Sequence, residues 1–237
     1  MTVQSNSVAV LALLTISNLC VGDDWPQWRG PRRDNISNET GLLQQWPKEG
    51  PPLSWRVEGL GTGIASIAVR DGAIFVLGYV GEHEYLTALD ETTGRRRWAT
   101  RLGPAVRENR LMRHRCQRMP TVDEELVFAL SGTGSLCCLR VEDGVEVWRK
   151  DYAKDFQVTP PRYGILDNPL VDGDRLICMP GGPKSALVAL NKQSGEVIWK
   201  CSTPGLGYGT FAPGSPGGVK QYVASVAKGL VGVSAES

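Results

Sequence analysis

Residues 86–98 read Leu-Thr-Ala-Leu-Asp-Glu-Thr-Thr-Gly-Arg-Arg-Arg-Trp, and the same pattern returns at residues 136–148 and 187–199. In each copy a glycine follows the polar position by four residues, and a tryptophan follows the glycine by four more. The recurring residues are Gly94 and Trp98, Gly144 and Trp148, and Gly195 and Trp199. Because the glycines are 50 and 51 residues apart, the sequence indicates a repeat protein with a stacked or radial architecture.

Each copy of the pattern reads as a β-hairpin. The short apolar run predicts a strand with a buried face, and the glycine supplies the positive φ that a tight turn needs. The polar position is held by Asp90, Arg140 and Asn191, a variety that is typical of a turn opener and not of a catalytic base. A weaker hairpin precedes each copy, at residues 69–76, 122–129 and 171–178. Two hairpins per period predict the four antiparallel strands of a propeller blade. A solenoid of helices is excluded, because no part of the sequence shows a sustained helical period.

The pattern Leu-x-Ala-Leu-Asp-x-x-Thr-Gly-x-x-x-Trp resembles the repeat of β-propellers of the pyrroloquinoline quinone (PQQ) type. That superfamily includes quinoprotein alcohol dehydrogenases and non-catalytic relatives such as the propeller subunit of the bacterial outer-membrane barrel-assembly machinery. The resemblance runs from about Trp25 to the C-terminus. Residues 24–31 and 41–47 are similar to the opening of secreted bacterial PQQ-like propeller proteins of unassigned function. The resemblance implies the fold and leaves the activity open.

The predicted fold is all-β, a partial β-propeller of four-stranded antiparallel blades with about three complete blades and an incomplete fourth. Residues 221–226 and 229–234 repeat the second and third strands of that fourth unit. After an N-terminal segment at 23–63, the blades are expected at about residues 64–102, 117–152, 165–203 and 207–237. Because propellers usually have four to eight blades, we interpret the chain as a truncated product or as one part of a split propeller whose missing blades another chain supplies.

Trp55 resembles the last strand of a blade whose other strands are absent from this part of the sequence. In a closed propeller, such an N-terminal strand completes the final blade and removes two exposed sheet edges. A complete ring of four blades, in which the segment around Trp55 supplies the outer strand of the fourth, is therefore the alternative to a partial ring.

Composition and the first residues bear on location. The 237 residues include 26 basic and 25 acidic side chains, so the chain has no overall field for binding nucleic acid. Residues 8–16 form an apolar run that fits the core of a signal peptide and is too short to span a bilayer. We therefore predict a signal peptide at residues 1–22, no transmembrane span, and a periplasmic or secreted bacterial protein.

Cysteines offer one suggestion of chemistry. Five remain after the leader, at Cys116, Cys137, Cys138, Cys178 and Cys201, and their pairing stays open because the number is odd. Quinoprotein alcohol dehydrogenases carry a vicinal disulfide over the cofactor, and the resemblance makes Cys137 and Cys138 the candidates. Cys138, however, takes the place of Ala88 and Ala189 in the repeat, which favours a small buried strand residue.

Catalytic residues are not identified by the sequence. The repeated tryptophans are interpreted as packing residues between neighbouring blades. A quinoprotein dehydrogenase needs a calcium site and an aspartate base, and the nearest acid and amide pair, Asp167 and Asn168, instead resembles the entry into a blade's first strand. We expect no catalytic, metal or cofactor site, and PQQ and calcium only under an enzymatic alternative.

One charged segment is a candidate for binding a partner. It lies between the first and second predicted blades and contains Arg107, Arg110, Arg113, His114, Arg115 and Arg118. Loops between blades lie at a rim or near the central channel, where ligands and partners bind, and arginines can receive an anionic group. The other interpretation is a solvated loop whose arginine stems cover apolar surface.

The function predicted from these features is that of an exported, non-catalytic propeller that binds a protein partner or acts as a scaffold. The alternative is a fragment of a PQQ- and calcium-dependent quinoprotein dehydrogenase that oxidises an alcohol or a sugar. A clustered set of calcium ligands with a usable vicinal disulfide would distinguish the enzyme.

Overall fold

The computed structural model describes residues 22–63, 65–106, 118–159, 164–202, 210–226 and 229–236. These residues form four antiparallel sheets, each called a blade below. The first blade contains β1 (Ala68–Arg70), β2 (Ala73–Val80), β3 (His83–Asp90) and β4 (Arg96–Pro104). The second contains β5 (Thr121–Asp123), β6 (Leu126–Leu130), β7 (Ser135–Arg140) and β8 (Glu146–Asp151).

The third blade contains β9 (Leu170–Asp172), β10 (Arg175–Cys178), β11 (Leu187–Asn191) and β12 (Val197–Cys201). The fourth contains β13 (Ala212–Gly214), β14 (Gln221–Val226) and β15 (Gly229–Ser234). The described residues add one α-helical turn, α1 (Tyr152–Phe156), and a 3-10 turn, η1 (Pro216–Gly218), and neither is long and apolar enough to cross a membrane. The prediction of an all-β partial propeller, with three complete blades and an incomplete fourth, is confirmed.

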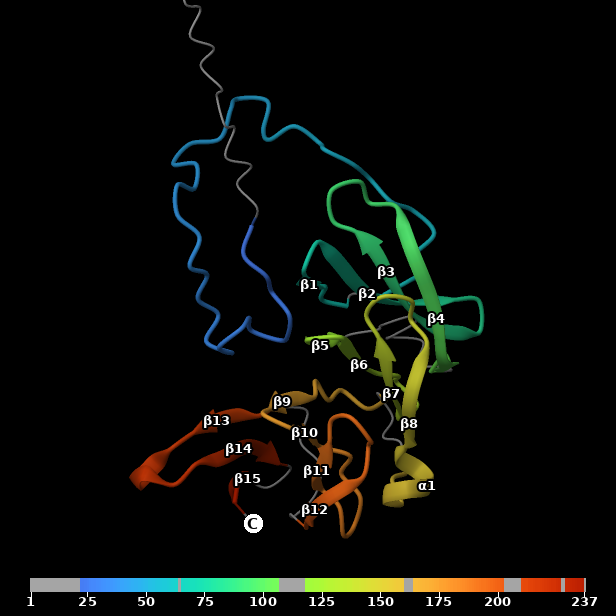
Figure 1. The fold of residues 1–237 in the computed structure, drawn as a ribbon, viewed down its shortest axis with the longest axis vertical. Coiled ribbons are helices and arrows are strands. Elements are labelled where there is room, and N and C mark those ends of the chain that lie inside the picture. Colours follow the sequence, from blue (N-terminus) through green and yellow to red (C-terminus); the bar gives the residue numbers. More distant parts are fainter. Residues whose placement is uncertain are drawn as a thin grey trace, which may run out of the picture.

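The blades follow one another around an arc (Figure 1). Their first strands, β1, β5, β9 and β13, converge on the inner side of the arc, and the later strands fan outward. Contacts between β1 and β5 and between β5 and β9 join the inner strands directly. Each strand order is sequential within its sheet, so every blade is a meander that runs from the axis to the periphery.

The register of the strands repeats from blade to blade. Asp90 lies opposite Ala73, Arg140 opposite Leu126, and Asn191 opposite Arg175. The fourth blade continues this register, because Ser234 lies opposite Gln221. In each of the first three blades the pairing of the third strand with the outer strand shifts after the same position. Ala88, Cys138 and Ala189 occupy this position on the third strands. The repeat in the sequence is therefore a repeat of hydrogen-bond register.

The turns of the outer hairpins depend on two positions, the glycine with positive φ and the polar residue four positions before it. Gly94 has φ 68°, Gly144 φ 70° and Gly195 φ 72°, the left-handed region that favours glycine. In the first blade the Asp90 carboxylate accepts hydrogen bonds from the Thr93 N–H at 2.9 Å and from its hydroxyl at 2.7 Å. Arg97 also donates to this carboxylate. The Arg97 hydrogen bond, followed by those of Thr93, lowers the pKa of Asp90 to about 2.

Tryptophans of one blade dock on the turn of the next. Trp98 Nε1 donates to the carbonyl oxygen of Val141 at 2.9 Å, and Trp148 Nε1 donates to that of Lys192 at 2.9 Å. Each acceptor lies three residues before the turn glycine. A Cβ on Gly144 would lie 2.5 Å from Trp98 Cε3, so the indole covers the Cα of the glycine. We call this contact the blade seam.

Apolar cores lie between neighbouring blades and not inside single ones. One cluster joins side chains of the first and second blades, another those of the second and third, and a third those of the third and fourth. Leu86, Leu136 and Leu187 are fully buried in these clusters, and each such side chain stabilises the fold by roughly 1.5–3 kcal/mol. A blade is stable because both its faces are covered.

Trp55 makes the same seam with the first blade. Its Nε1 donates to the carbonyl oxygen of Glu91 at 3.1 Å, and a Cβ on Gly94 would lie 2.8 Å from Trp55 Cε3. No strand is assigned to residues 51–59, however, and among the described residues β15 is paired in a sheet with β14 only. The segment around Trp55 therefore does not close a four-bladed ring within this chain.

We predict that Gly195→Ala destabilises the fold more than Gly173→Ala does. Both glycines have positive φ, 72° and 59°, which costs a residue with a Cβ roughly 1–2 kcal/mol. At Gly195 the new Cβ would also lie 2.7 Å from Trp148 Cδ2, whereas at Gly173 nothing lies within 4 Å. Overpacking should add about 1–3 kcal/mol to the loss at Gly195. Urea unfolding measures both, and equal losses would contradict the steric account of the seam.

Candidate functional site

The segment of residues 25–35, called the axial segment below, lies along the inner strands. Trp25 exchanges two backbone hydrogen bonds with Val69 of β1, at 2.9 and 3.1 Å. The Val122 N–H of β5 donates to the carbonyl oxygen of Pro26 at 2.8 Å. The backbone of the axial segment is thereby hydrogen-bonded to the inner strands β1 and β5 of the first two blades.

Arg33 extends the axial segment to the third and fourth blades. Its Nη2 donates to Thr210 Oγ1 at 2.5 Å, and its Nη1 lies 3.5 Å from the carbonyl oxygen of Pro169. Thr210 lies just before β13 and Pro169 just before β9. The guanidinium is buried, and this burial lowers its pKa to about 10. One short segment thus contacts the inner ends of all four described blades.

Backbone conformations in the axial segment are unusual. Arg29 has φ 69°, Arg33 φ 57° and Asn35 φ 61°. Left-handed conformations of residues other than glycine cost about 1–3 kcal/mol each and persist where the surrounding contacts fix them. Gly30, with φ 82°, allows a close approach, since a Cβ there would lie 2.8 Å from Trp25 Cη2. Within the segment the Asn35 N–H donates to the carbonyl oxygen of Arg29 at 3.0 Å, and the Arg33 side chain contacts the blades, so internal bonds and blade contacts together hold this shape.

A groove of about 660 Å³ opens between the axial segment and the start of the first blade. Its lining combines two indoles, a guanidinium, an amide and apolar side chains, and consists of Trp25, Trp28, Arg29, Asn35, Ala65, Ser66, Ile67 and Met119. Trp28 and Arg29 are half-buried, whereas Ile67 is exposed. We call it the axial groove. Aromatic and arginine side chains are the residue types that contribute most to protein–protein binding.

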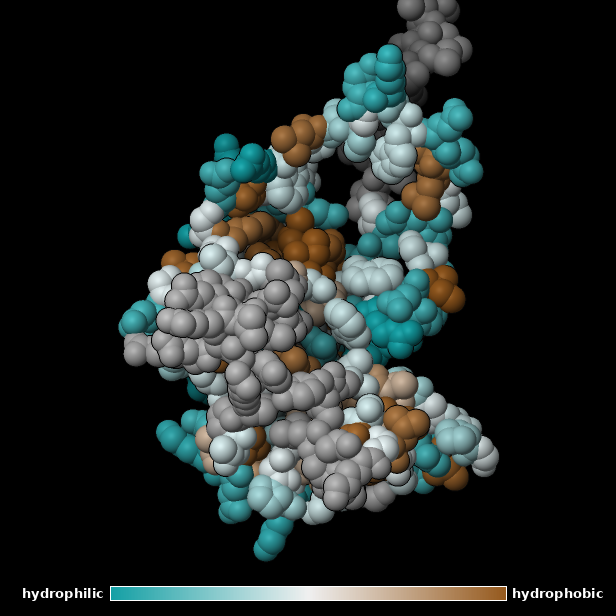
Figure 2. All heavy atoms as spheres, turned by 180° about the vertical axis from the view of Figure 1, so that it is seen from behind, coloured by the Kyte–Doolittle hydropathy of each residue, from teal (hydrophilic) through white to brown (hydrophobic). Residues whose placement is uncertain are grey.

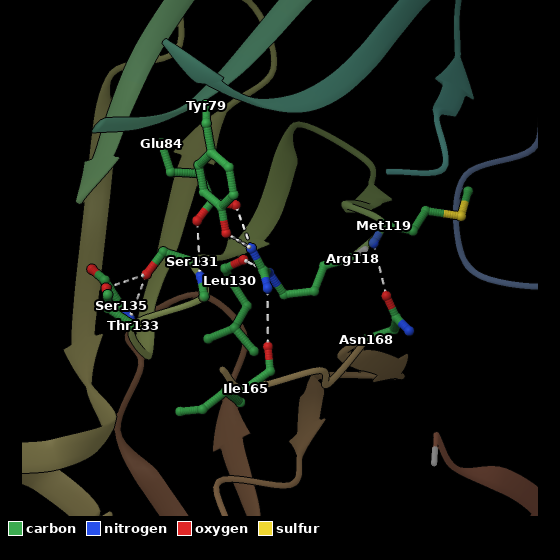
Figure 3. Close-up of polar contacts among 11 residues, drawn as sticks. Tyr79, Glu84, Arg118, Met119, Leu130, Ser131, Thr133, Ser135, Ile165 and Asn168 are labelled. Atoms are coloured by element: carbon green, nitrogen blue, oxygen red, sulfur yellow. Dashed lines mark hydrogen bonds and ion pairs between the residues drawn. The ribbon is translucent and has the colours of Figure 1, made fainter. Parts of the chain in front are cut away.

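Beside the axial groove, a buried ion pair joins three blades (Figure 3). Arg118 Nη2 lies 2.6 Å from Glu84 Oε1, and the two side chains are 1% and 0% exposed. Arg118 also donates to the carbonyl oxygens of Leu130 at 2.9 Å and Ile165 at 3.1 Å. The other oxygen of Glu84 accepts from the Gly132 N–H at 2.8 Å. Through these hydrogen bonds the ion pair links the first blade to the second and third.

Asp167 and Arg118 occupy equivalent positions in neighbouring blades. Asp167 lies three residues before β9 of the third blade, and Arg118 lies three residues before β5 of the second. Its Oδ2 accepts from the Met179 N–H at 2.7 Å, whereas its Oδ1 is buried with no hydrogen-bond partner among the described residues. Burial raises the pKa of Asp167 to about 6, opposed in part by the Met179 hydrogen bond and the charge of Arg33. Asn168 Oδ1 accepts from the Met119 N–H at 2.8 Å. Asp167 therefore binds the backbone just after β10, and Asn168 binds the backbone just before β5.

The predicted partner-binding loop is only partly within the described chain. Arg107, Arg110, Arg113, His114 and Arg115 lie outside the described residues, so their role stays a prediction. Arg118 is different, because its side chain is buried and paired with Glu84. Including Arg118 in an exposed binding loop was wrong. The feature that misled was the run of arginines, which ends at a residue that already faces the axis.

Two adjacent cysteines face opposite cores. Cys137 belongs to the core between the first and second blades and Cys138 to the core between the second and third. Both are free thiols and fully buried, and burial raises their pKa values to about 11 and about 12. They are therefore unreactive packing residues. Cys116 lies outside the described residues.

Sequence reasoning missed the axial segment's contacts and the carboxylate of Glu84. One signal was available, since Arg118 and Asp167 both stand two residues before a proline, Pro120 and Pro169. Equivalent charged residues at this place in two repeats indicate a shared buried position. Nothing in the pattern identified their partners. Within the described ranges no group of three or more His, Cys, Asp or Glu side chains could hold a metal ion.

Comparisons with known proteins agree with this architecture. The sequence model of the family described as outer membrane protein assembly factor BamB matches residues 82–236. The quinohemoprotein alcohol dehydrogenase of Comamonas testosteroni is similar over 76% of this chain and 27% of its own, with 20% identity and a TM-score of 0.56. BamB from Moraxella catarrhalis is similar over 74% of this chain and 46% of its own, with 19% identity and a TM-score of 0.42.

The likeness to the quinohemoprotein alcohol dehydrogenase extends, at this identity, to the fold alone. The chain spans less than half the length of either solved structure. No curated protein matches the sequence.

We predict that Arg118→Met destabilises the fold by about 3–5 kcal/mol, because it leaves the carboxylate of Glu84 buried and unpaired. Arg140→Met is the matched control, since Arg140 pairs with Asp143 at 52% and 41% exposure and exposed pairs contribute little. Urea denaturation measures the free energy of unfolding of both variants. Similar small losses would show that the buried pair does not join the blades.

We predict that Asp167→Asn becomes more favourable relative to the wild type as the pH rises from 4 to 7.5. The folded pKa of Asp167 is about 6, above its ordinary 3.8, so the neutral carboxyl stabilises the fold at low pH and this stability is lost as pH rises through 6. At 1.36 kcal/mol per pKa unit the difference between the variant and the wild type should grow by roughly 2.4 kcal/mol over this range. Unfolding free energies across this range test it, and a pH-independent difference would contradict it.

Proposed function

The chain belongs to the family described as outer membrane protein assembly factor BamB, and from this membership we propose that it is a non-catalytic propeller that binds a protein partner at its axial groove. We further propose that it is exported to the periplasm or secreted, with residues 1–22 as its signal peptide. The family's description names an assembly factor, which is a protein that acts through other proteins. The whole protein's partners are part of the proposal, because this chain spans only part of its relatives.

The observation that carries the proposal is the position of the axial segment. Its backbone joins β1 and β5, and its Arg33 side chain reaches Pro169 and Thr210. The inner strands are the part of a propeller where a ligand in the central channel would lie. Here the axial segment lies along them, and the axial groove opens at the edge of this segment.

The composition of the axial groove fits a polypeptide. Trp28 and Arg29 project from a segment whose backbone is fixed, so little conformational entropy is lost when they bind. Half-buried indole and guanidinium groups give large contact area and charge-assisted hydrogen bonds. Asn35 and Ser66 add hydrogen-bonding groups at the sides. An extended segment with an apolar side chain and a carboxylate matches this surface.

The described residues do not fit PQQ and calcium. A vicinal disulfide cannot stack on a cofactor where Cys137 and Cys138 are buried in different cores. Both oxygens of Glu84 are hydrogen-bonded, one to Arg118 and the other to the Gly132 N–H. Asp167 binds the Met179 N–H through one oxygen, and its other oxygen is a single acceptor without a hydrogen-bond partner among the described residues. Oxygen ligands for calcium must be free and clustered. The likeness to a quinohemoprotein alcohol dehydrogenase is therefore interpreted as a likeness of scaffold.

We predict that the purified chain, incubated with PQQ and calcium, elutes from gel filtration without quinone absorbance and shows no dye-linked oxidation of alcohols. Immobilised on a resin, it should retain specific proteins from the envelope fraction of its own organism. Trp28→Ala should release these proteins, because it removes a half-buried indole from the lining of the axial groove. Quantitative mass spectrometry of the bound fraction measures the change.

Trp46→Ala is the control for the binding measurement. Trp46 is 66% exposed and lies in the same N-terminal part of the chain, outside the axial groove. It should leave the bound fraction unchanged. Equal binding by wild type and both variants would contradict a role for the axial groove, and retained PQQ with turnover would contradict the non-catalytic function.

A further inference from the structure

A second groove, of about 540 Å³, lies between the first and second blades and shares no lining residue with the axial groove. We call it the interblade groove. Its lining includes Arg101 and Gly103 of β4, Thr133 between β6 and β7, Ser135 of β7, and Arg149 of β8. Side chains of two neighbouring blades, most of them polar, therefore converge on one hollow of the surface.

Exposed apolar side chains of the N-terminal segment form a contrast with this groove. Figure 2 shows hydrophobic side chains scattered along that segment, away from the sheets. Apolar side chains scattered singly are normal on a protein surface. The interblade groove is more specific, because its side chains come from separate strands that the fold brings together.

The helical turn α1 fills the equivalent place between the second and third blades. It follows β8 directly (Figure 1), and its Tyr152 and Phe156 are buried in the core between these blades. The carbonyl oxygen of Phe156 accepts from Ser185 Oγ at 3.0 Å, and Lys200 Nζ lies 5.4 Å from the centroid of the Phe156 ring. One turn of polypeptide with a buried aromatic ring therefore fits between two blades of this fold.

The repeat explains why the place next to the first blade is open. Arg101 stands three residues after its outer tryptophan, as Asp151 does in the second blade. The Asp151 side chain accepts two backbone N–H hydrogen bonds and so caps α1, whereas an arginine side chain has no acceptor and cannot cap a helix. After Arg101 the chain continues as β4 to Pro104, paired with β3. The interblade groove is the space that α1 fills in the next pair of blades.

Arg149 offers the groove a fixed, planar guanidinium. It stands directly after the outer tryptophan of its blade, as Lys200 does in the third. Its nitrogens donate to the Glu146 carboxylate, the carbonyl oxygen of Leu102 and the Ser135 hydroxyl. The N–H groups of a guanidinium lie in its plane, so these bonds hold the group in place and leave its faces free. Guanidinium faces stack on aromatic rings.

Arg101 supplies a charge that the fold does not use. Its side chain is exposed, and among the described residues it donates no hydrogen bond and forms no ion pair. The nearby carboxylates are occupied, because Asp151 caps α1 and Glu146 lies 2.6 Å from Arg149 Nη2. A guanidinium without a partner binds a carboxylate through charge-assisted hydrogen bonds.

We propose that the interblade groove binds a single turn of a partner polypeptide, with an aromatic ring on the face of Arg149 and a carboxylate against Arg101. α1 shows the size of the segment that fits between two blades, and the two guanidiniums specify its side chains. Thr133 Oγ1, which lies 3.1 Å from Ser131 Oγ (Figure 3), adds a hydroxyl for the backbone of the bound segment. The occupant is thus an acidic, aromatic turn of protein.

The test uses a capped synthetic peptide of residues 151–157, Asp-Tyr-Ala-Lys-Asp-Phe-Gln, because this sequence fills the equivalent place in the next pair of blades. It is titrated into the full, ¹⁵N-labelled chain, and the backbone N–H signals are followed by NMR. The signals of Leu102, Gly103 and Thr133 should shift and saturate. A peptide with alanine in place of phenylalanine should bind roughly 2- to 5-fold more weakly, because it lacks the ring that stacks on Arg149.

Variants of the chain locate the binding. Arg101→Met should raise the dissociation constant of the peptide roughly 3- to 10-fold, the loss of one charge-assisted contact at an exposed site. Arg95→Met is the matched control, because Arg95 is exposed in the same hairpin and lies outside the groove. Gly103→Val should abolish binding, since its Cβ would lie 3.6 Å from Thr133 Oγ1 without a clash and its methyl groups would occupy the groove.

Urea unfolding shows that each variant is folded, and Trp28→Ala should leave peptide binding unchanged because it lies in the axial groove. A failure of the axial groove to bind proteins would therefore leave this result intact. The proposal would be overturned by the absence of saturable shifts, by shifts confined to other parts of the chain, by equal binding to Arg101→Met and Arg95→Met, or by equal binding of the two peptides.

Discussion

The structure depends on one contact, an indole lying against a glycine of the next blade with its N–H bonded to a carbonyl oxygen three residues earlier. The glycine must lack a Cβ and must have positive φ, so the turn and the seam impose the same residue. Trp55, Trp98 and Trp148 all make this hydrogen bond. Because each seam joins one blade's outer strand to the next blade's turn, the blades are fixed in sequence around the axis.

Trp199 shows what happens where this contact is incomplete. Its Nε1 is buried without a hydrogen-bond partner among the described residues. The equivalent acceptor would be the carbonyl oxygen of Ala235, which instead accepts a hydrogen bond from Arg175. Trp199 still packs near Tyr222, with ring centroids 6.2 Å apart. Between the third and fourth blades the indole of Trp199 therefore packs near Tyr222, and the hydrogen bond of the seam is not made.

The sequence predicted those features that repeat. Glycine spacing and apolar alternation identified the strands, including β14 and β15 of the fourth blade, because every blade satisfies the same local requirements. It did not predict α1, a single turn capped by Asp151 that is too short to show a helical period. Nor did it predict the partner of Arg118, since the contact with Glu84 occurs once and joins residues 34 positions apart. A pattern that is found once cannot be distinguished from chance in one sequence.

Function in such a fold is expected where the repeat is broken. Arg118 and Asp167 occupy equivalent backbone positions yet carry opposite charges, so the scaffold fixes the backbone and leaves the axial side chains free to vary. The axial segment lies outside the repeat altogether and supplies Trp28 and Arg29 to the axial groove. Its backbone is hydrogen-bonded to β1 and β5, and its Arg33 side chain contacts the inner ends of the third and fourth blades. The repeated seams thereby fix the blades on which this one non-repeated surface is built.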